Sequence, residues 1–187
     1  VYPQTIDKSI ISQLANEELH KYLNQIPLGQ EQMFGFNNSE EFSKAEIGVP
    51  YEVYTLNSDF FNDEIISINK SYVITTNNWR VPVVVDNQNR ALLTISKYNN
   101  NWAVVKLGAT GLANELEMFE QNNSSSSELK ILRVFQITTD FILTNDDKLY
   151  PLPSAKKLVM SNETRNIGHY LHDMLLIIKS KINVNEK

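Results

Sequence analysis

The sequence predicts an α+β fold, an antiparallel β-meander sheet of about four to six strands with amphipathic helices packed on one face. Three apolar stretches, 79–86, 90–98 and 102–107, are separated by asparagine-rich turns. An amphipathic pattern follows the third stretch directly, and further amphipathic patterns lie near both ends of the chain. Strands joined by tight turns pair antiparallel, and an amphipathic helix must bury its apolar side, so helices should cover the meander.

The first expected element is a helix from about Thr5 to Gln25. Its apolar residues recur at nearly helical spacing, and Pro27 with Gly29 ends it. A stretch rich in loop residues then leads to an expected strand over 49–56. Residues 59–68 fit a short helix or a strand equally well.

The three apolar stretches specify their own pairing. With turns at 87–89 and 99–101, the face of the middle strand that carries Ala91, Leu93 and Ile95 lies opposite apolar residues on both sides. A slip of one residue would turn this face to water, so the register is strongly specified. The expected pairs are Val81–Ile95, Val83–Leu93, Val85–Ala91, Ile95–Val105 and Leu93–Leu107.

A helix is expected directly after the meander. Leu112, Leu116 and Phe119 recur at i, i+4 and i+7, and this stripe should cover the apolar face of the sheet. The joint 108–111 resembles a phosphate-binding loop only in its two glycines, since no Lys-Ser/Thr pair follows. We interpret it as a tight connection between strand and helix.

The polar run 122–127 predicts a linker. We expect residues 1–187 to form a single α+β domain, with a subdivision at this linker into 1–121 and 128–187 as the alternative. Beyond the linker, 129–143 is expected to be one long or bent strand. A turn at 145–147 and a returning strand over 148–152 should follow.

The C-terminal helix is the clearest helical prediction. Its apolar positions alternate in steps of three and four and are Ile167, Leu171, Met174, Ile178 and Ile182. Such a stripe is typical of core, and a seam for a partner helix is the alternative.

Two histidines on this expected helix are the weak candidates for a metal site. His169 and His172 stand three residues apart and could face one way. A metal site usually needs three or four ligands, and the sequence offers no obvious third one. We therefore predict no metal and no cofactor.

Composition excludes several classes of partner and chemistry. The net charge of −5 argues against a nucleic-acid partner, because phosphates are bound by a basic face. The absence of cysteine excludes disulfides and thiol catalysis. The longest apolar run, 174–178, is far shorter than the roughly 20 residues that span a bilayer, so no transmembrane segment is expected.

The sequence begins at Val1 rather than at a methionine. We therefore expect an extracytoplasmic protein that is secreted, periplasmic or, as a lipoprotein, held at the surface by a lipid anchor upstream of Val1. A domain cut from a cytoplasmic chain is the alternative.

The sequence offers little support for catalysis. It lacks the Gly-x-Ser-x-Gly elbow, and its carboxylate pairs, such as Glu40–Glu41 and Asp146–Asp147, are direct neighbours in polar surroundings. Adjacent side chains point in different directions, which makes such pairs poor acid–base partners. We predict no catalytic residues.

Three aromatic residues near the ends of meander strands are the candidate ligand-binding residues. Trp79, Tyr98 and Trp102 would form an exposed patch suited to a protein, peptide or glycan, or else pack at the rim of the core. We therefore expect a non-enzymatic, exported or surface-tethered binding domain. An enzyme inhibitor or pro-segment that uses the hairpin tip at 99–101 or a strand edge is the alternative. A hydrolase with an unrecognised site is the second alternative.

Overall fold

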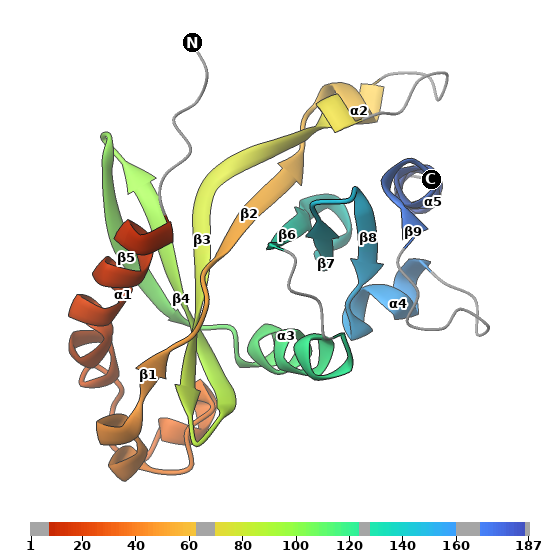
Figure 1. The fold of residues 1–187 in the computed structure, drawn as a ribbon. Coiled ribbons are helices and arrows are strands. Elements are labelled where there is room, and N and C mark those ends of the chain that lie inside the picture. The colour runs from red at the N-terminus through yellow and green to blue at the C-terminus, as the bar shows by residue number, and fades with distance from the viewer. Residues whose placement is uncertain (1–7, 63–69, 124–127, 160–168, 186–187) are drawn as a thin grey trace. The chain divides into compact units, whose positions relative to one another are not determined.

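The computed structural model describes residues 8–62, 70–123, 128–159 and 169–185 (Figure 1). The fold is α+β, as predicted, and the described residues form a mostly antiparallel sheet of nine strands together with several helices. The expectation of four to six strands was too low. Two of the strands have only two residues each, which is too short to leave a periodic pattern in the sequence.

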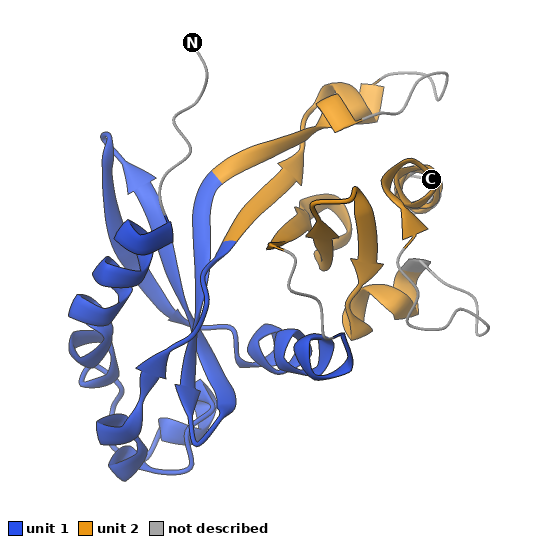
Figure 2. Ribbon diagram, in the orientation of Figure 1, with its two compact units in different colours: residues 1–51, 77–124 blue, residues 52–76, 125–187 orange. Residues whose placement is uncertain are grey.

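The chain forms two compact units (Figure 2). Unit 1 comprises Val1–Tyr51 and Asn77–Ser124, and unit 2 comprises Glu52–Thr76 and Ser125–Lys187. One boundary coincides with the predicted linker, of which residues 124–127 lie outside the described residues. The assignment of Glu52–Thr76 to the second unit had no signal in the sequence. The single-domain expectation stays a prediction.

Unit 1 contains the meander. Its elements are α1 (Lys8–Leu23), the 3-10 helices η1 (Glu31–Phe34) and η2 (Ser39–Lys44), β1 (Glu46–Ile47), most of β3 (Val73–Val85), β4 (Gln88–Tyr98), β5 (Asn101–Gly108) and α3 (Thr110–Asn122). β4 pairs antiparallel with β3 and β5, and β1 pairs with β3. The tight joint between strand and helix is present, with β5 ending at Gly108 and α3 beginning at Thr110.

The meander turns are tighter than predicted. They consist of Asp86–Asn87 and Asn99–Asn100, and all four residues have positive φ, as in the two-residue turns that Asn tolerates. Leu93 pairs with Leu107 as expected. The other pairs differ from the prediction and are Trp79–Ile95, Val81–Leu93, Val83–Ala91 and Ile95–Val104.

The tighter turns shift the register, and two β-bulges each reverse that shift by one residue. Arg90 is an extra residue in β4 between the pairs Val83–Ala91 and Val84–Asn89. Val105 is an extra residue in β5 between the partners of Thr94 and Ile95. The shift on the β3 side is two residues, so the same face of β4 stays apolar.

α1 seals that face of the meander. The core of unit 1 joins Ile11, Leu19 and Leu23 of α1 to Leu93 and Ile95 of β4. We expected the helix after the meander to do this, and that expectation was wrong. Periodicity identifies the apolar side of each element, but it does not identify the element that covers it.

α3 packs against β4 from the other side. Leu92 is fully buried and points away from the α1 face, and the buried residues of α3, Ala113 and Leu116, are absent from the core that contains Leu93. Figure 1 draws α1 and α3 on opposite sides of β4. Unit 1 is therefore layered as helix, sheet and helix.

Unit 2 has a second core. Its elements are β2 (Tyr51–Leu56), α2 (Asp59–Asn62), η4 (Lys70–Tyr72), β6 (Leu129–Val134), η5 (Phe135–Ile137), β7 (Thr139–Thr144), β8 (Lys148–Pro151), α4 (Pro153–Val159), β9 (His169–Tyr170) and α5 (Leu171–Asn185). β2 pairs parallel with β6, and the pairs from β6 to β9 are antiparallel. The full strand order is β5-β4-β3-β2-β6-β7-β8-β9, with β1 on β3.

The stretch 129–143 is not one long strand. It folds back on itself as β6 and β7, which pair antiparallel around η5. The chain reverses at Thr138, which has a positive φ. β-branched residues rarely adopt this conformation, so the sequence does not predict the reversal. The predicted turn at 145–147 and the returning strand are present.

α5 confirms the core interpretation of the C-terminal stripe. Leu171, Met174, Ile178 and Ile182 are all buried in the core of unit 2, whereas Ile167 lies outside the described residues. We had expected His169 on this helix. The helix begins only at Leu171, and His169 lies in β9. No helix in the described parts of the chain has the length and apolarity that crossing a membrane requires.

Candidate functional site

The structure places the three predicted ligand-binding aromatics in different surroundings. Trp79 is only 4% exposed and belongs to the core of unit 1. Trp102 packs half-buried against the same core, and the Nζ of Lys97 lies 6.0 Å from the centre of its ring. Tyr98 is 74% exposed and pairs with Asn101 at the hairpin end.

Tyr98 and Trp102 project from opposite faces of the β4–β5 hairpin. Trp102 lies directly across from Lys97, and neighbouring residues in a strand point to opposite faces. The three aromatics therefore do not form one patch. Tyr98 offers an exposed ring beside the turn, while Trp102 supports the other face.

The two histidines of unit 2 are held differently. His169 is half-buried in β9, and its Nε2 has no hydrogen-bond partner among the described residues. His172 lies in the first turn of α5. Within the described ranges, the structure brings together no group of three or more His, Asp or Glu side chains that could hold a metal ion.

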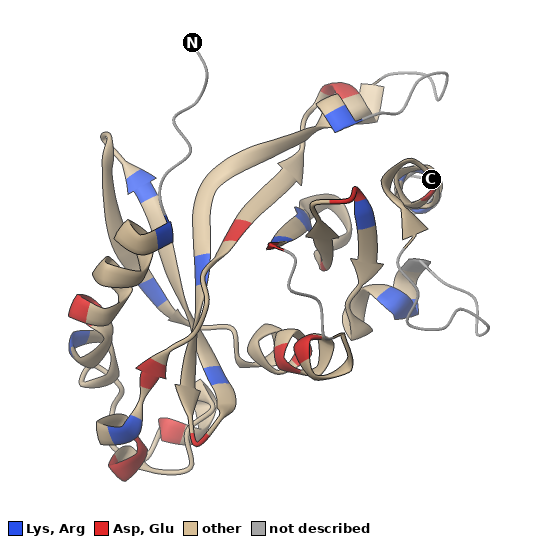
Figure 3. Ribbon diagram, in the orientation of Figure 1, with Lys and Arg blue, Asp and Glu red and all other residues tan. Residues whose placement is uncertain are grey.

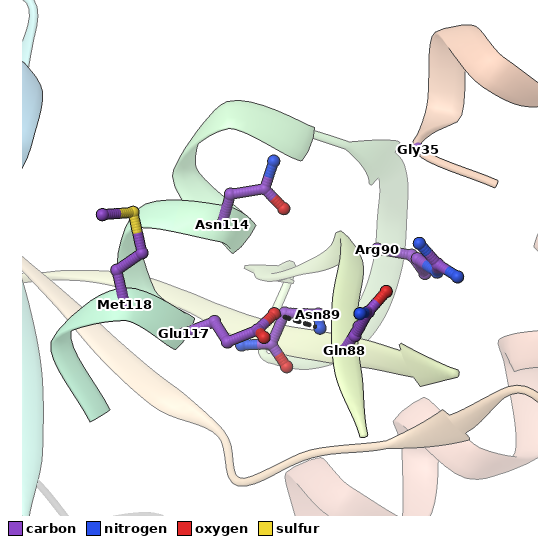
Figure 4. Close-up of a pocket in the computed structure, with 7 residues that line it drawn as sticks. All are labelled: Gly35, Gln88, Asn89, Arg90, Asn114, Glu117 and Met118. Atoms are coloured by element: carbon purple, nitrogen blue, oxygen red, sulfur yellow. Dashed lines mark hydrogen bonds between the residues drawn. The ribbon is translucent and has the colours of Figure 1, made fainter. Parts of the chain in front are cut away.

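A pocket of about 320 Å³ lies in unit 1 beside the β4 bulge (Figure 4). Its walls come from the end of η1, the start of β4 and one side of α3. The lining residues are Gly35, Gln88, Asn89, Arg90, Asn114, Glu117 and Met118. Asn114, Glu117 and Met118 share one side of α3 because they are spaced i, i+3 and i+4.

The bulge directs Arg90 into a buried ion pair. Its Nη2 lies 2.8 Å from Oε1 of Glu41, and the two side chains are only 17% and 11% exposed. Glu41 also accepts hydrogen bonds from the backbone N and the Nδ2 of Asn37, at 2.8 and 2.6 Å. Burial raises the pKa of Glu41, but the Asn37 donors and the Arg90 charge outweigh it and hold that pKa below its usual value.

Gly35 allows η1 to approach the bulge closely. It has a φ of +89°, and a Cβ at this position would lie 2.1 Å from the carbonyl oxygen of Arg90. No other residue fits there without moving the backbone. The close approach forms the β4 side of the pocket.

Glu117 is fixed on the α3 wall by two hydrogen bonds. Its Oε2 accepts from the backbone N of Asn89 at 2.7 Å, and its Oε1 accepts from Nε2 of Gln121 at 2.9 Å. The Nδ2 of Asn89 reaches the carbonyl oxygen of Ala113 at 3.5 Å. These contacts tie α3 to the first residues of β4, as Figure 4 shows for Glu117.

Two exposed amides complete the lining. The side chains of Gln88 and Asn114 make no hydrogen bond to any described residue, and both are exposed. α3 contributes negative charge, since Glu115, Glu117 and Glu120 are its only charged residues (Figure 3). The pocket therefore offers amide donors and acceptors beside a carboxylate.

The sequence does not reveal this pocket. Its pattern predicts a turn at Asn89, whereas Asn89 is a strand residue that joins β4 to α3. The pairing of Arg90 with Glu41 connects residues 49 positions apart, and no local pattern reveals such a contact. The abundance of polar residues in 87–90, directly after an apolar run, was the one available signal.

The edge strand β5 is irregular. The Val105 bulge interrupts its ladder, and the hydroxyl of Tyr22 donates a hydrogen bond to the carbonyl oxygen of Val104. Bulges and blocked carbonyls protect an edge strand from pairing with another chain.

No protein-family model matches this chain, and neither a curated protein sequence nor a solved structure is significantly similar to it.

Proposed function

We propose that this chain is a non-enzymatic binding domain, exported or tethered to a surface, that contacts a protein or peptide partner through the tip of the β4–β5 hairpin. The observation that carries the proposal is the 74% exposure of Tyr98 next to the Asn99–Asn100 turn. An exposed aromatic ring beside a tight turn can serve as the anchor of an interface, because it offers a large apolar surface to a partner.

The hairpin tip suits recognition of a protein. A two-residue turn holds the flanking strands in one geometry, so Tyr98 is presented with little conformational freedom to lose on binding. Tyr and Trp are enriched at the energetic centres of interfaces because they combine a large apolar surface with a polar end.

The inhibitor alternative uses the same tip. It differs only in the partner, which would then be an enzyme whose active-site cleft receives the tip. The strand-edge version of that alternative is disfavoured by the bulge at Val105 and the Tyr22–Val104 hydrogen bond on β5. Export stays part of the proposal, and fractionation of the producing cells tests it.

Site-specific photo-crosslinking tests the hairpin proposal. A benzophenone amino acid at position 98 should capture a discrete partner in the producing cells, while the same group at Leu28, which is 89% exposed, should not. With the partner purified, we expect Tyr98→Ala to weaken binding about tenfold or more and Leu28→Ala to leave it unchanged. Equal capture at both positions, or wild-type affinity of Tyr98→Ala, would contradict the proposal.

A further inference from the structure

We propose that the pocket at the β4 bulge is a second binding site, which takes a neutral ligand rich in hydroxyl groups, such as one sugar unit of a glycan. It is independent of the hairpin proposal, since none of its lining residues belongs to the hairpin tip. Its volume of about 320 Å³ lies at the lower end of the range for small-molecule sites, which suits a ligand of this size.

The hydrogen-bonding groups of the pocket define the chemistry of the ligand. The amides of Gln88 and Asn114 each carry two donor hydrogens and an acceptor oxygen, while the carboxylate of Glu117 only accepts. A fitting ligand must therefore accept from the amides and donate to Glu117 within a small space. Each hydroxyl of a sugar does both on one atom, and neighbouring hydroxyls repeat the pattern around the ring.

Charge disfavours the other ligand classes. The charge of Arg90 is already balanced by Glu41, and the carboxylate of Glu117 makes the α3 wall negative, so an anion would be repelled. A cation could pair with Glu117 but would leave the amide donors facing a group that cannot accept. A neutral ligand that both donates and accepts satisfies all of these groups.

The walls are held in place before a ligand arrives. Glu117 is fixed by Asn89 and Gln121, and the β4 side is fixed by the bulge and by Gly35 against Arg90. Bulges often re-aim side chains beside binding sites. Met118, 53% exposed, adds an apolar surface at the rim against which the carbon face of a sugar ring can pack.

Nitrogen-15 NMR of the whole chain tests the site, because the side-chain NH₂ groups of Gln88 and Asn114 give their own signals. The probes are glucose, galactose, mannose and N-acetylglucosamine, with N-acetylglycine methylamide, choline and acetate as the peptide-like, cationic and anionic arms. We expect saturable shifts of these NH₂ signals with at least one of the sugars and with none of the other three probes.

Variants then assign the binding to the pocket. Gln88→Ala, Asn114→Ala and Glu117→Gln should each weaken sugar binding about three- to tenfold, the typical effect of losing one hydrogen bond. Asn114→Ala places a better helix former on an exposed position of α3, so weaker binding cannot be ascribed to unfolding. The matched control Asn24→Ala removes an exposed amide elsewhere in unit 1 and should bind like wild type.

Three results would overturn the site. They are no saturable shift with any of the sugars, saturable shifts with the peptide-like, cationic or anionic probe in place of sugars, and sugar shifts that persist unchanged in Asn114→Ala. Because the hairpin test uses Tyr98, its outcome does not affect this one.

Discussion

A single inserted residue, Arg90, organises the polar corner of unit 1. As the extra residue of the β4 bulge it has no cross-strand partner, and its guanidinium pairs with Glu41 of η2 instead. Both side chains are largely buried, so each depends on the other for compensation of its charge. The Asn37 donors complete the shell around the carboxylate.

Replacing Glu41 tests this pair and its dependence on pH. Glu41→Gln leaves Arg90 buried beside a neutral group, and we expect a loss of about 2–4 kcal/mol in the free energy of unfolding at neutral pH. Urea titrations followed by tryptophan fluorescence measure it, because both tryptophans, Trp79 and Trp102, belong to unit 1.

The sign of the pH effect follows from the lowered pKa of Glu41. Its ordinary value is 4.5 and its value in the folded chain is lower, so the carboxylate stabilises the fold fully above the ordinary value. That stabilisation is lost as the pH falls through the folded pKa. The difference in stability between wild type and Glu41→Gln should therefore shrink below about pH 4.5. A difference that stays constant from neutral to acidic pH would refute this role.

Among the elements, α1 is the helix that covers the apolar face of the meander. Its buried residues share a core with the apolar face of β3, β4 and β5. An isolated helix of this length is marginal in water, so the sheet stabilises α1 as much as α1 shields the sheet. α3 has a different task, since it closes the other face of β4 and forms one wall of the pocket.

Substitutions of two adjacent isoleucines in α1 distinguish the effect of burial on stability from the effect of helix propensity. Ile11 is fully buried, while Ile10 is 52% exposed. We expect Ile11→Ala to lower the free energy of unfolding by about 2–4 kcal/mol through the cavity it leaves, and Ile10→Ala to change it by less than about 1 kcal/mol. Similar effects of the two substitutions, measured by urea unfolding, would mean that α1 does not seal the meander.

At the scale of the whole chain, two cores without a shared residue support two compact units. The core of unit 1 centres on α1 and the meander, and that of unit 2 centres on α5 with β6, β7 and β8. Separate cores commonly open as separate cooperative units. β3 contributes residues to both units, so the chain crosses between them inside one strand.

A substitution in the second core tests their independence. Met174→Ala removes a fully buried side chain of unit 2, and far-ultraviolet circular dichroism should show the destabilisation. The unfolding transition seen by tryptophan fluorescence, which reports on unit 1, should shift by less than about 0.5 kcal/mol. Equal losses by both measurements would show that the two units unfold together.

The sequence by itself determined the features that depend on near neighbours. Alternation of apolar residues and the Asn turns specified the three meander strands and the buried face of β4, and helical spacing specified α1, α3 and the stripe of α5. The candidate residue Tyr98 was also recognisable, because an aromatic beside a hairpin turn is visible in sequence. These signals are local: turn conformation and side-chain periodicity are set within a few residues.

Only the tertiary structure decided which surfaces meet. The choice of α1 as the cover of the meander, the parallel pairing of β2 with β6, and the burial of Trp79 depend on contacts between distant segments. The reversal at Thr138 was hidden because all six residues of β7 are buried and show no alternation. The pocket could not be predicted from the sequence either, because Arg90 and Glu41 are brought together by packing and not by their spacing in the chain.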